Sequence, residues 1–158
     1  MDSDTPALKA LQDSQLDYEV VRTERATSAE ESARFQGIEL HQLLRTIVLR
    51  RGENDYIFVL VPGGRAIDWP KLRGHLGVSR LSLPDKDEAT VATGYERGAI
   101  TPFGSTNPWP VIADGSIASS ERVAIGGGAH GVNLHVTAGD LFAHLGAQVA
   151  DVTKPAEN

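Results

Sequence analysis

Apolar residues occur along the chain in short blocks that are separated by glycine, proline and charged residues. Blocks rich in valine, isoleucine and leucine predict strands; these cover residues 18–21, 43–51, 56–61, 80–83, 110–113, 121–125, 132–136 and 147–152. Capping residues and apolar positions at helical spacing predict helices; these cover residues 6–16, 28–37, 68–77, 84–92 and 137–145. The irregular order of strands and helices favours an α+β fold with a mixed sheet or a partly closed barrel over regular βαβ winding.

The strands over residues 43–51 and 56–61 are joined by the polar segment Gly52-Glu-Asn-Asp55 and are expected to form a hairpin. Side chains alternate between the two faces of a strand, so Arg45 shares a face with Ile47 and Leu49. A guanidinium among apolar neighbours must find a partner or reach an open cavity. Arg45 is therefore a candidate functional residue.

Two segments contain too many glycines to form regular elements. Residues 94–104 include three glycines and Pro102, and residues 126–131 read Gly-Gly-Gly-Ala-His-Gly. Because glycine has no Cβ, such loops can bring backbone N–H groups close to a ligand carbonyl or phosphate. A structural corner between two elements explains segment 94–104 equally well. His130, in the second loop, is either a ligand contact or a polar turn residue.

Length and composition narrow the class of protein. A chain of 158 residues fits one domain over residues 1–158, with a frayed tail expected at residues 153–158. The absence of cysteine excludes disulfides, thiolate chemistry and cysteine-bound zinc. No apolar run is long enough for a membrane span, and no basic segment followed by an apolar one stands at the start, so a cytoplasmic protein is expected.

The charge is unevenly distributed. The formal net charge of −6 argues against tight non-specific binding to nucleic acid. Residues 41–80 nevertheless carry seven Lys or Arg against three Asp or Glu. This basic segment either faces a phosphate backbone or consists of scattered surface charges.

Several catalytic motifs are missing from the sequence, among them the Gly-x-Ser-x-Gly elbow, the P-loop and His-Glu-x-x-His. The five histidines lack paired ligand spacing, so neither a metal nor another cofactor is predicted. With no evident nucleophile, catalysis would depend on positioning and on backbone electrostatics. Water or a substrate hydroxyl would then be the attacking group.

Four motifs in order along the chain resemble the YbaK/ProX-type aminoacyl-tRNA editing domains. This family includes free-standing deacylases and the editing insertion of bacterial prolyl-tRNA synthetases. The motifs are Leu43–Arg50, Leu60–Leu72, Gly94–Gly104, and Gly126–Gly128 followed by Ala147–Val152. The resemblance extends over about residues 18–152. It implies an α+β fold with a mixed, strongly curved and partly barrel-like sheet and flanking helices.

The resemblance also implies an activity: hydrolysis of the ester that joins a wrong amino acid to the 3′ end of a tRNA, typically tRNA for proline. The Gly-x-x-x-Pro loop of the family falls on Gly98–Pro102, where its backbone would bind or polarise the ester. Arg45 and Gly98 are thereby implied as catalytic residues. The implied substrate contacts are Thr27, Thr46, Ile100, Thr101, Pro102, Gly127, Gly128 and His130. The implied partners are the 3′ end of an aminoacyl-tRNA and a synthetase, with no cofactor and no membrane.

One departure from the family pattern concerns the strand lysine of the family, which corresponds to Arg45. Arginine keeps the positive charge and can hold a phosphate or a ribose by a forked contact, but it cannot act as a base. Two alternatives stay open: a trans-editing deacylase that removes a small amino acid such as alanine, serine or cysteine, and a non-catalytic module that binds aminoacyl-tRNA, an amino acid or a synthetase. A hydrolase of small-molecule esters or amides is a third.

Overall fold

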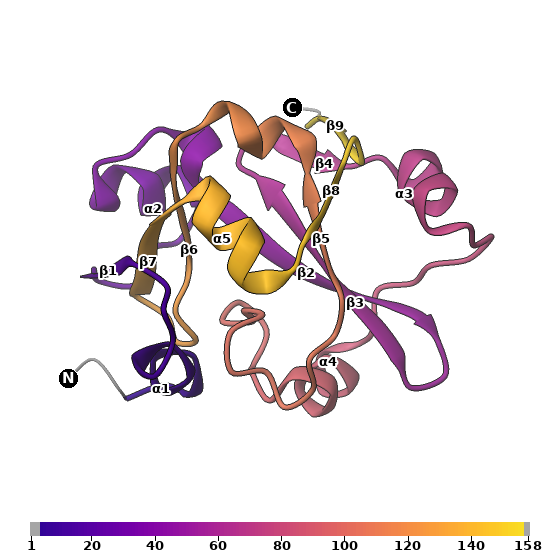
Figure 1. The fold of residues 1–158 in the computed structure, drawn as a ribbon, viewed down its shortest axis with the longest axis horizontal. Coiled ribbons are helices and arrows are strands. Elements are labelled where there is room, and N and C mark those ends of the chain that lie inside the picture. Colours follow the sequence, from indigo (N-terminus) through magenta and orange to yellow (C-terminus); the bar gives the residue numbers. More distant parts are fainter. Residues whose placement is uncertain (1–3, 157–158) are drawn as a thin grey trace.

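The computed structural model describes residues 4–156 and has an α+β architecture (Figure 1). The α-helices are α1 (Pro6–Gln12), α2 (Ala29–Gln36), α3 (Trp69–Leu76), α4 (Lys86–Thr93) and α5 (Ala138–Leu145). The strands are β1 (Tyr18–Arg22), β2 (Leu44–Gly52), β3 (Asp55–Pro62), β4 (Arg65–Ile67), β5 (Val111–Asp114), β6 (Arg122–Gly126), β7 (Val132–Thr137), β8 (Gln148–Ala150) and β9 (Thr153–Pro155). Two short 3-10 helices cover Leu40–Gln42 and Gly115–Ser119.

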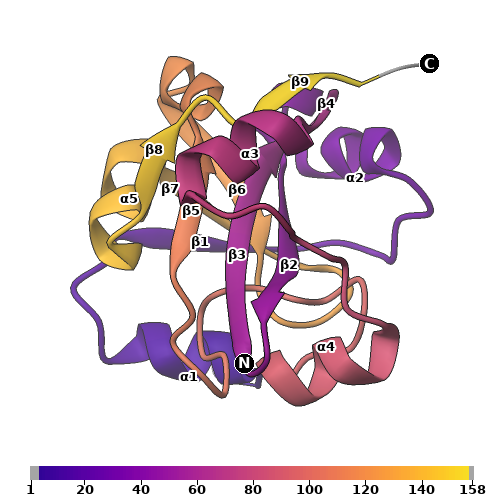
Figure 2. The same ribbon diagram turned by 90° about the vertical axis from the view of Figure 1, so that its right-hand side faces the viewer.

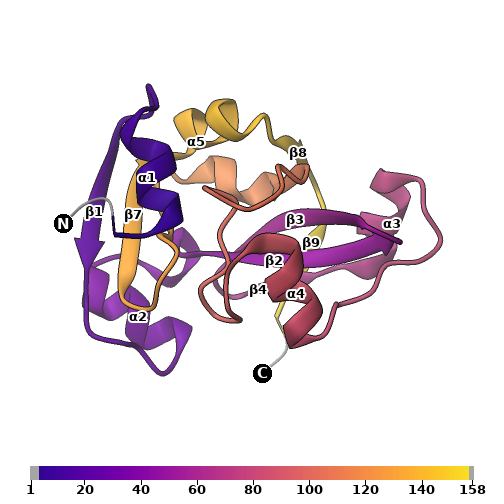
Figure 3. The ribbon, with the colours of Figure 1, turned by 90° about the horizontal axis from the view of Figure 1, so that it is seen from below.

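Within residues 4–156 the strands form three sheets, and they do not close into the partly barrel-like sheet that was expected. An antiparallel sheet has the order β1-β7-β6, and a mixed sheet has the order β2-β3-β5-β8. β2 and β3 form the expected hairpin, whereas β3 pairs with β5 in parallel. β4 and β9 make a small third sheet. Figure 3 shows the first two sheets side by side, with the loop that follows α4 between them.

The mixed sheet is buried on both faces. All residues of β3 after Asp55 are buried, which is typical of a central strand covered on both sides. One face packs on a large apolar cluster shared with the β1-β7-β6 sheet and helices α1, α4 and α5, to which Leu44 and Val48 belong. The other face, with Ile47 and Leu49, packs in a smaller cluster with Leu72 of α3. Figure 2 shows α3 in front of this sheet, close to β4 and β9.

Helix boundaries follow from capping residues, as the sequence predicted. The side chains of Ser28, Asp68 and Asp85 accept hydrogen bonds from main-chain N–H groups three residues later, at distances of 3.0, 3.2 and 2.8 Å. α2, α3, α4 and α5 all end at a glycine in the left-handed conformation. None of the helices in the described range is long and apolar enough to cross a membrane.

Several predicted boundaries were wrong. The strand expected at residues 80–83 is reduced to one bridge, between Ser82 and Arg50, because the segment pairs at that point only. The tail expected to fray at residues 153–158 instead contributes β9, which pairs with β4; residues 157–158 lie outside the described range. The first helix ends at Gln12, four residues early, and the strand expected at 147–152 is confined to β8.

Candidate functional site

A cavity opens where the two larger sheets diverge. Leu43, just before β2, forms a single parallel bridge with Ala124 of β6, and this is where the sheets meet. Beyond this point lies a cavity of about 530 Å³. Its lining comes from β2, the start of α4, the loop after α4, β6 and β7, namely Leu43, Leu44, Arg45, Thr46, Ile47, Val48, Leu83, Pro84, Ala89, Arg97, Gly98, Ile100, Gly126 and Asn133. Arg45 and Gly98, far apart in sequence, thus line one cavity.

The outer edge of β2 presents main-chain groups to this cavity. β2 is an edge strand, and its outer side pairs only at Leu43 and at Arg50 among the described residues. Arg50 exchanges both main-chain hydrogen bonds with Ser82, at 2.8 and 3.1 Å, so its N–H and C=O point outward. Outward and inward directions alternate along an antiparallel strand, so the N–H and C=O groups of Thr46 and Val48 also point outward. The cavity wall therefore offers backbone donors beside the Thr46 hydroxyl, which is itself buried without a hydrogen-bond partner.

The loop from Gly94 to Gly104 is held at both ends. Gly94 ends α4, and the buried hydroxyl of Tyr95 donates to the carbonyl of Phe103 at 2.6 Å. Burial raises the pKa of Tyr95 to about 12, which keeps this donor protonated. Gly104 has φ +66°, and a Cβ there would lie 2.4 Å from the carbonyl oxygen of Pro6. The loop is therefore a structural corner as well as part of the cavity wall.

The second glycine-rich loop borders a smaller cavity on the other side of Gly98 and Ile100. This cavity has a volume of about 170 Å³ and shares four residues with the larger one. The shared residues are Gly98, Ile100, Gly126 and Asn133. The smaller cavity is lined in addition by Arg25, Ala26, Ser28, Ser32, Ala99 and residues 128–132. The two cavities are thus compartments of one site, divided by the segment 98–100.

His130 connects the two loops. Its Nε2 lies 3.2 Å from a carboxylate oxygen of Glu96, and its ring faces Gly98. Gly98 has φ +91°, and a Cβ built on it would lie 2.9 Å from Cε1 of His130. Only glycine allows both this backbone conformation and this close approach.

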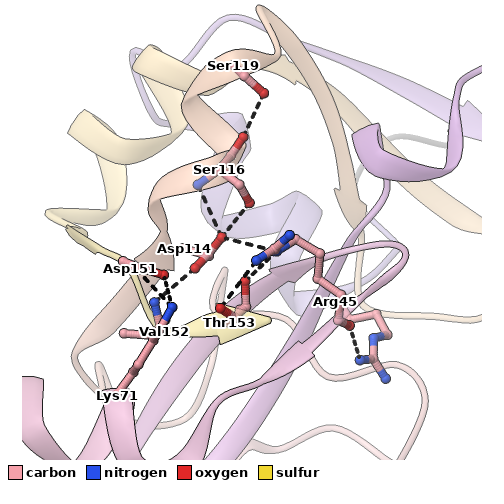
Figure 4. A network of polar contacts seen from close by, with 9 residues as sticks. Arg45, Lys71, Asp114, Ser116, Ser119, Asp151, Val152 and Thr153 are labelled. Atoms are coloured by element: carbon pink, nitrogen blue, oxygen red, sulfur yellow. Dashed lines mark hydrogen bonds and ion pairs between the residues drawn. The ribbon is translucent and has the colours of Figure 1, made fainter. Parts of the chain in front are cut away.

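Arg45 is attached to a network that reaches the protein interior (Figure 4). Its Nη2 donates to the main-chain carbonyl of Arg65 at 3.4 Å. The guanidinium of Arg65 in turn donates to the Thr153 hydroxyl at 2.6 Å and lies 3.9 Å from the carboxylate of Asp114. Strands β4 and β9 therefore position the carbonyl that holds Arg45.

Asp114 is the buried end of this network. Its carboxylate accepts hydrogen bonds from the Ser116 amide at 3.1 Å, from the Ser116 hydroxyl, and from the Val152 amide at 3.0 Å. Burial alone would raise the pKa of Asp114, but these hydrogen bonds outweigh it and lower the pKa below its usual 3.8. The carboxylate is thus charged opposite Arg65 at neutral pH.

The site as a whole attracts anions. Among residues 4–156, its two compartments are lined by Arg25, Arg45 and Arg97 and by no aspartate or glutamate. In a chain of net charge −6 this is a local concentration of positive charge. No group of three or more histidine, aspartate or glutamate side chains in residues 4–156 lies in an arrangement able to hold a metal ion.

The structure brings most of the predicted site residues together. Thr46 lines the larger compartment, Ile100 lines both, and Gly128 and His130 line the smaller one. Thr101, within the loop, is fully buried, and its hydroxyl has no hydrogen-bond partner. Neither Thr101 nor Pro102 lines a compartment.

Two more of the predicted contacts lie outside the lining. Thr27 is exposed and donates its amide and hydroxyl to Glu31 at 2.8 and 3.1 Å, which makes it a helix-start residue. Gly127 is buried, and its carbonyl accepts a hydrogen bond from the Thr5 hydroxyl at 2.7 Å. Both make local structural contacts, and their sequence neighbours line the smaller compartment, so a contact of either residue with substrate stays a prediction.

The sequence analysis missed Asn133, which lines both compartments from β7. Its Nδ2 donates to the Val21 carbonyl at 3.2 Å, which holds the side chain against β1. The available signal was a polar residue between Val132 and Leu134, in a strand where apolar and polar residues alternate. Arg97 and Arg25 were also missed, because their only signal was a charge beside a turn.

Comparison with known proteins identifies the family. The aminoacyl-tRNA editing domain family matches residues 23–143. The chain is 28% identical over 109 residues to the proline–tRNA ligase of Thermosipho melanesiensis, covering 69% of this chain and 19% of the ligase. It is 23% identical over 137 residues to EbsC of Enterococcus faecalis, a candidate Cys-tRNA(Pro)/Cys-tRNA(Cys) deacylase, covering 87% of this chain and 84% of EbsC. The chain thus spans about a fifth of the ligase and most of EbsC.

Solved structures show the same fold. A crystal structure described as that of a candidate trans-editing enzyme for prolyl-tRNA synthetase superposes with a TM-score of 0.81 and 27% identity, covering 94% of this chain and 92% of that one. The hypothetical protein APE2540 superposes with a TM-score of 0.85 at 20% identity, covering 94% of this chain and 99% of that one. Because the family match covers most of the chain, this protein belongs to the aminoacyl-tRNA editing domain family.

Proposed function

We propose that this protein is a trans-editing deacylase that hydrolyses the ester between a small non-cognate amino acid and the 3′ end of a tRNA for proline. The observation that carries the proposal is the two-compartment site itself. Its described lining contains three arginines and no acidic residue, with the Glu96 carboxylate beside His130, and both compartments meet at the glycine loop around Gly98. The relatives named above support it, since one is a candidate deacylase of Cys-tRNA(Pro) and another is a proline–tRNA ligase.

In this proposal the ester lies at the boundary between the compartments. The larger compartment, of about 530 Å³, receives the terminal nucleotide, with Arg45 and Arg97 facing its phosphate or ribose. The smaller compartment, of about 170 Å³, receives the amino acid and rejects larger side chains by size. Size alone discriminates weakly between similar side chains. We therefore expect small amino acids to be removed faster than larger ones, without complete exclusion of the larger ones.

Catalysis in this proposal comes from position and backbone dipoles. N–H groups of Gly98 and Ile100, which line both compartments, and of the β2 edge polarise the ester carbonyl and stabilise the developing oxyanion. Arg45 supplies positive charge and cannot accept a proton, so the nucleophile is a water molecule held beside the ribose. Its oxygen bonds to the ester carbon, the bond from that carbon to the ribose oxygen breaks, and the proton of the water passes to the departing ribose oxygen. The carbonyl of Arg65 orients Arg45, because it accepts the hydrogen bond from Nη2.

The test is deacylation of tRNA for proline charged with alanine, serine, cysteine or proline. We expect acceleration above the spontaneous rate for at least one small amino acid, and loss of most of that activity in Arg45→Ala. Arg122→Ala is the matched control, because Arg122 is an exposed arginine outside both compartments. Unchanged activity in Arg45→Ala would remove Arg45 from the mechanism. Binding of tRNA without turnover of any ester would favour a non-catalytic binding module.

A further inference from the structure

A second hollow, separate from the site above, is lined by four arginines. It has a volume of about 560 Å³, and its lining is Arg50, Arg51, Gly52, Arg73, Ser79, Arg80, Leu81 and Ser82. These residues come from the end of β2, from α3 and from the segment between α3 and α4. No aspartate or glutamate contributes to the lining. Figure 1 shows α3, the segment that follows it and the end of the β2–β3 hairpin on the same side of the molecule.

The positive charge of this hollow is only partly balanced within the protein. Arg51 pairs with Asp55 at 2.9 Å, and Arg50 lies 3.7 Å from Glu88. Arg73 and Arg80 make no ion pair with any residue in the described range. Two guanidinium groups thus converge on one concavity without a counter-charge in a protein of net charge −6. Such a local excess of positive charge attracts anions from solution.

The hollow lies next to the cavity between the sheets, along the same two chain segments. Arg50 and Ser82 are joined by two main-chain hydrogen bonds, at 2.8 and 3.1 Å. On one side of this bridge, residues 44–48 and 83–84 line the larger compartment of the site. On the other side, residues 50–52 and 79–82 line the arginine hollow. The same two chain segments therefore form both walls, and Arg45 and Arg50 are five positions apart along β2, a distance of about 17 Å.

We propose that the arginine hollow binds backbone phosphates of the tRNA acceptor stem while the 3′ end occupies the cavity between the sheets. This inference rests on the proposed function. A ligand that reaches both places must extend over about 17 Å along β2, which requires a polymer of anions rather than one nucleotide. The hollow offers guanidinium groups, serine hydroxyls and the backbone N–H of a glycine. These are the kinds of hydrogen-bond donor that bind nucleic-acid phosphates in proteins. The hollow would thus supply affinity for tRNA that the terminal nucleotide alone does not.

The experiment measures binding, so that it does not depend on catalysis. Arg73→Gln/Arg80→Gln is compared with the charge-matched control Lys9→Gln/Arg122→Gln, since Lys9 and Arg122 are exposed and line neither the site nor the hollow. Each protein is titrated with uncharged tRNA for proline and with the trinucleotide CCA, over a range of salt concentrations. Thermal unfolding confirms that both double variants are folded.

We expect the hollow variant to bind the tRNA about tenfold more weakly than the control, because two charge-assisted phosphate contacts are lost. Its slope of log affinity against log salt should fall by about one for each arginine removed. Affinity for CCA should equal that of the control. Equal tRNA affinity in both variants would overturn this inference without contradicting the proposed function. An acidic protein surface would then be the next ligand of the hollow to test. Failure of the unmodified protein to bind tRNA would overturn both.

Discussion

The substitution Gly98→Ala tests whether the glycine loop is part of the catalytic apparatus. Gly98 has φ +91°, where residues other than glycine carry a strain of about 1–3 kcal/mol. The new methyl group would also lie 2.9 Å from Cε1 of His130, so the ring or the loop must move. Displacing the ring breaks its contact with Glu96. This contact is partly exposed to solvent, so it contributes at most about 1 kcal/mol to the free energy of unfolding.

The expected effect on activity is larger than the effect on stability. Either movement shifts the loop amides relative to Arg45, and a misplacement of about 1 Å in a catalytic group can lower the rate about a hundredfold. We therefore expect kcat/KM for deacylation to fall about a hundredfold, and the free energy of unfolding to fall by about 1–3 kcal/mol.

Gly146→Ala provides the control. Gly146 ends α5 with φ +60° and would place its Cβ in open space, so the variant carries backbone strain of about 1–2 kcal/mol away from the site. Steady-state deacylation and urea unfolding are measured on both variants. If both lose similar stability and Gly98→Ala retains the activity of Gly146→Ala, then the conformation of the loop has no part in catalysis and the reasoning fails.

Two further predictions concern the supports of the site. Asp114→Asn should lower the free energy of unfolding at pH 7 by about 2–3 kcal/mol, because hydrogen bonds to a charged acceptor are lost. Since the pKa of Asp114 is lowered by folding, its contribution to stability is present above about pH 4 and is lost as the pH falls through the folded-state pKa. In urea unfolding from pH 7 to pH 2, the free energies of unfolding of the two proteins should therefore converge. A difference that stays constant with pH would contradict this. Tyr95→Phe leaves the Phe103 carbonyl unpaired and should lower the free energy of unfolding by about 1–3 kcal/mol in the same assay. An unchanged unfolding midpoint would show that the loop is anchored elsewhere.

Local signals were sufficient for much of the fold. The ends of α2, α3 and α4 were predicted because a capping side chain and a terminal glycine act within a few residues of each other. The β2–β3 hairpin was predicted because its pairing is local. By contrast, β4 and β9 each have three residues and pair with each other across about ninety positions of sequence. Local sequence patterns cannot predict pairing between segments so far apart.

The site was partly predictable for the same reason. Gly98, Arg45 and His130 stood out as residues that their local pattern does not explain. Asn133 and Arg97 acquire a place in the site only because the two sheets meet at Leu43 and then diverge, which is a property of the whole fold. Thr27 and Gly127 lie beside the smaller compartment without lining it, because their polar groups bond to Glu31 and Thr5.

The central claim is that the cavity between the sheets hydrolyses the ester of a mischarged tRNA. The most direct measurement mixes an excess of this protein with tRNA for proline labelled on its amino acid, and follows release of the label in a single turnover. We predict that alanine, serine or cysteine is released faster than in buffer alone and faster than proline. Release of no amino acid above the spontaneous rate, or release of all four at one rate, would contradict the account.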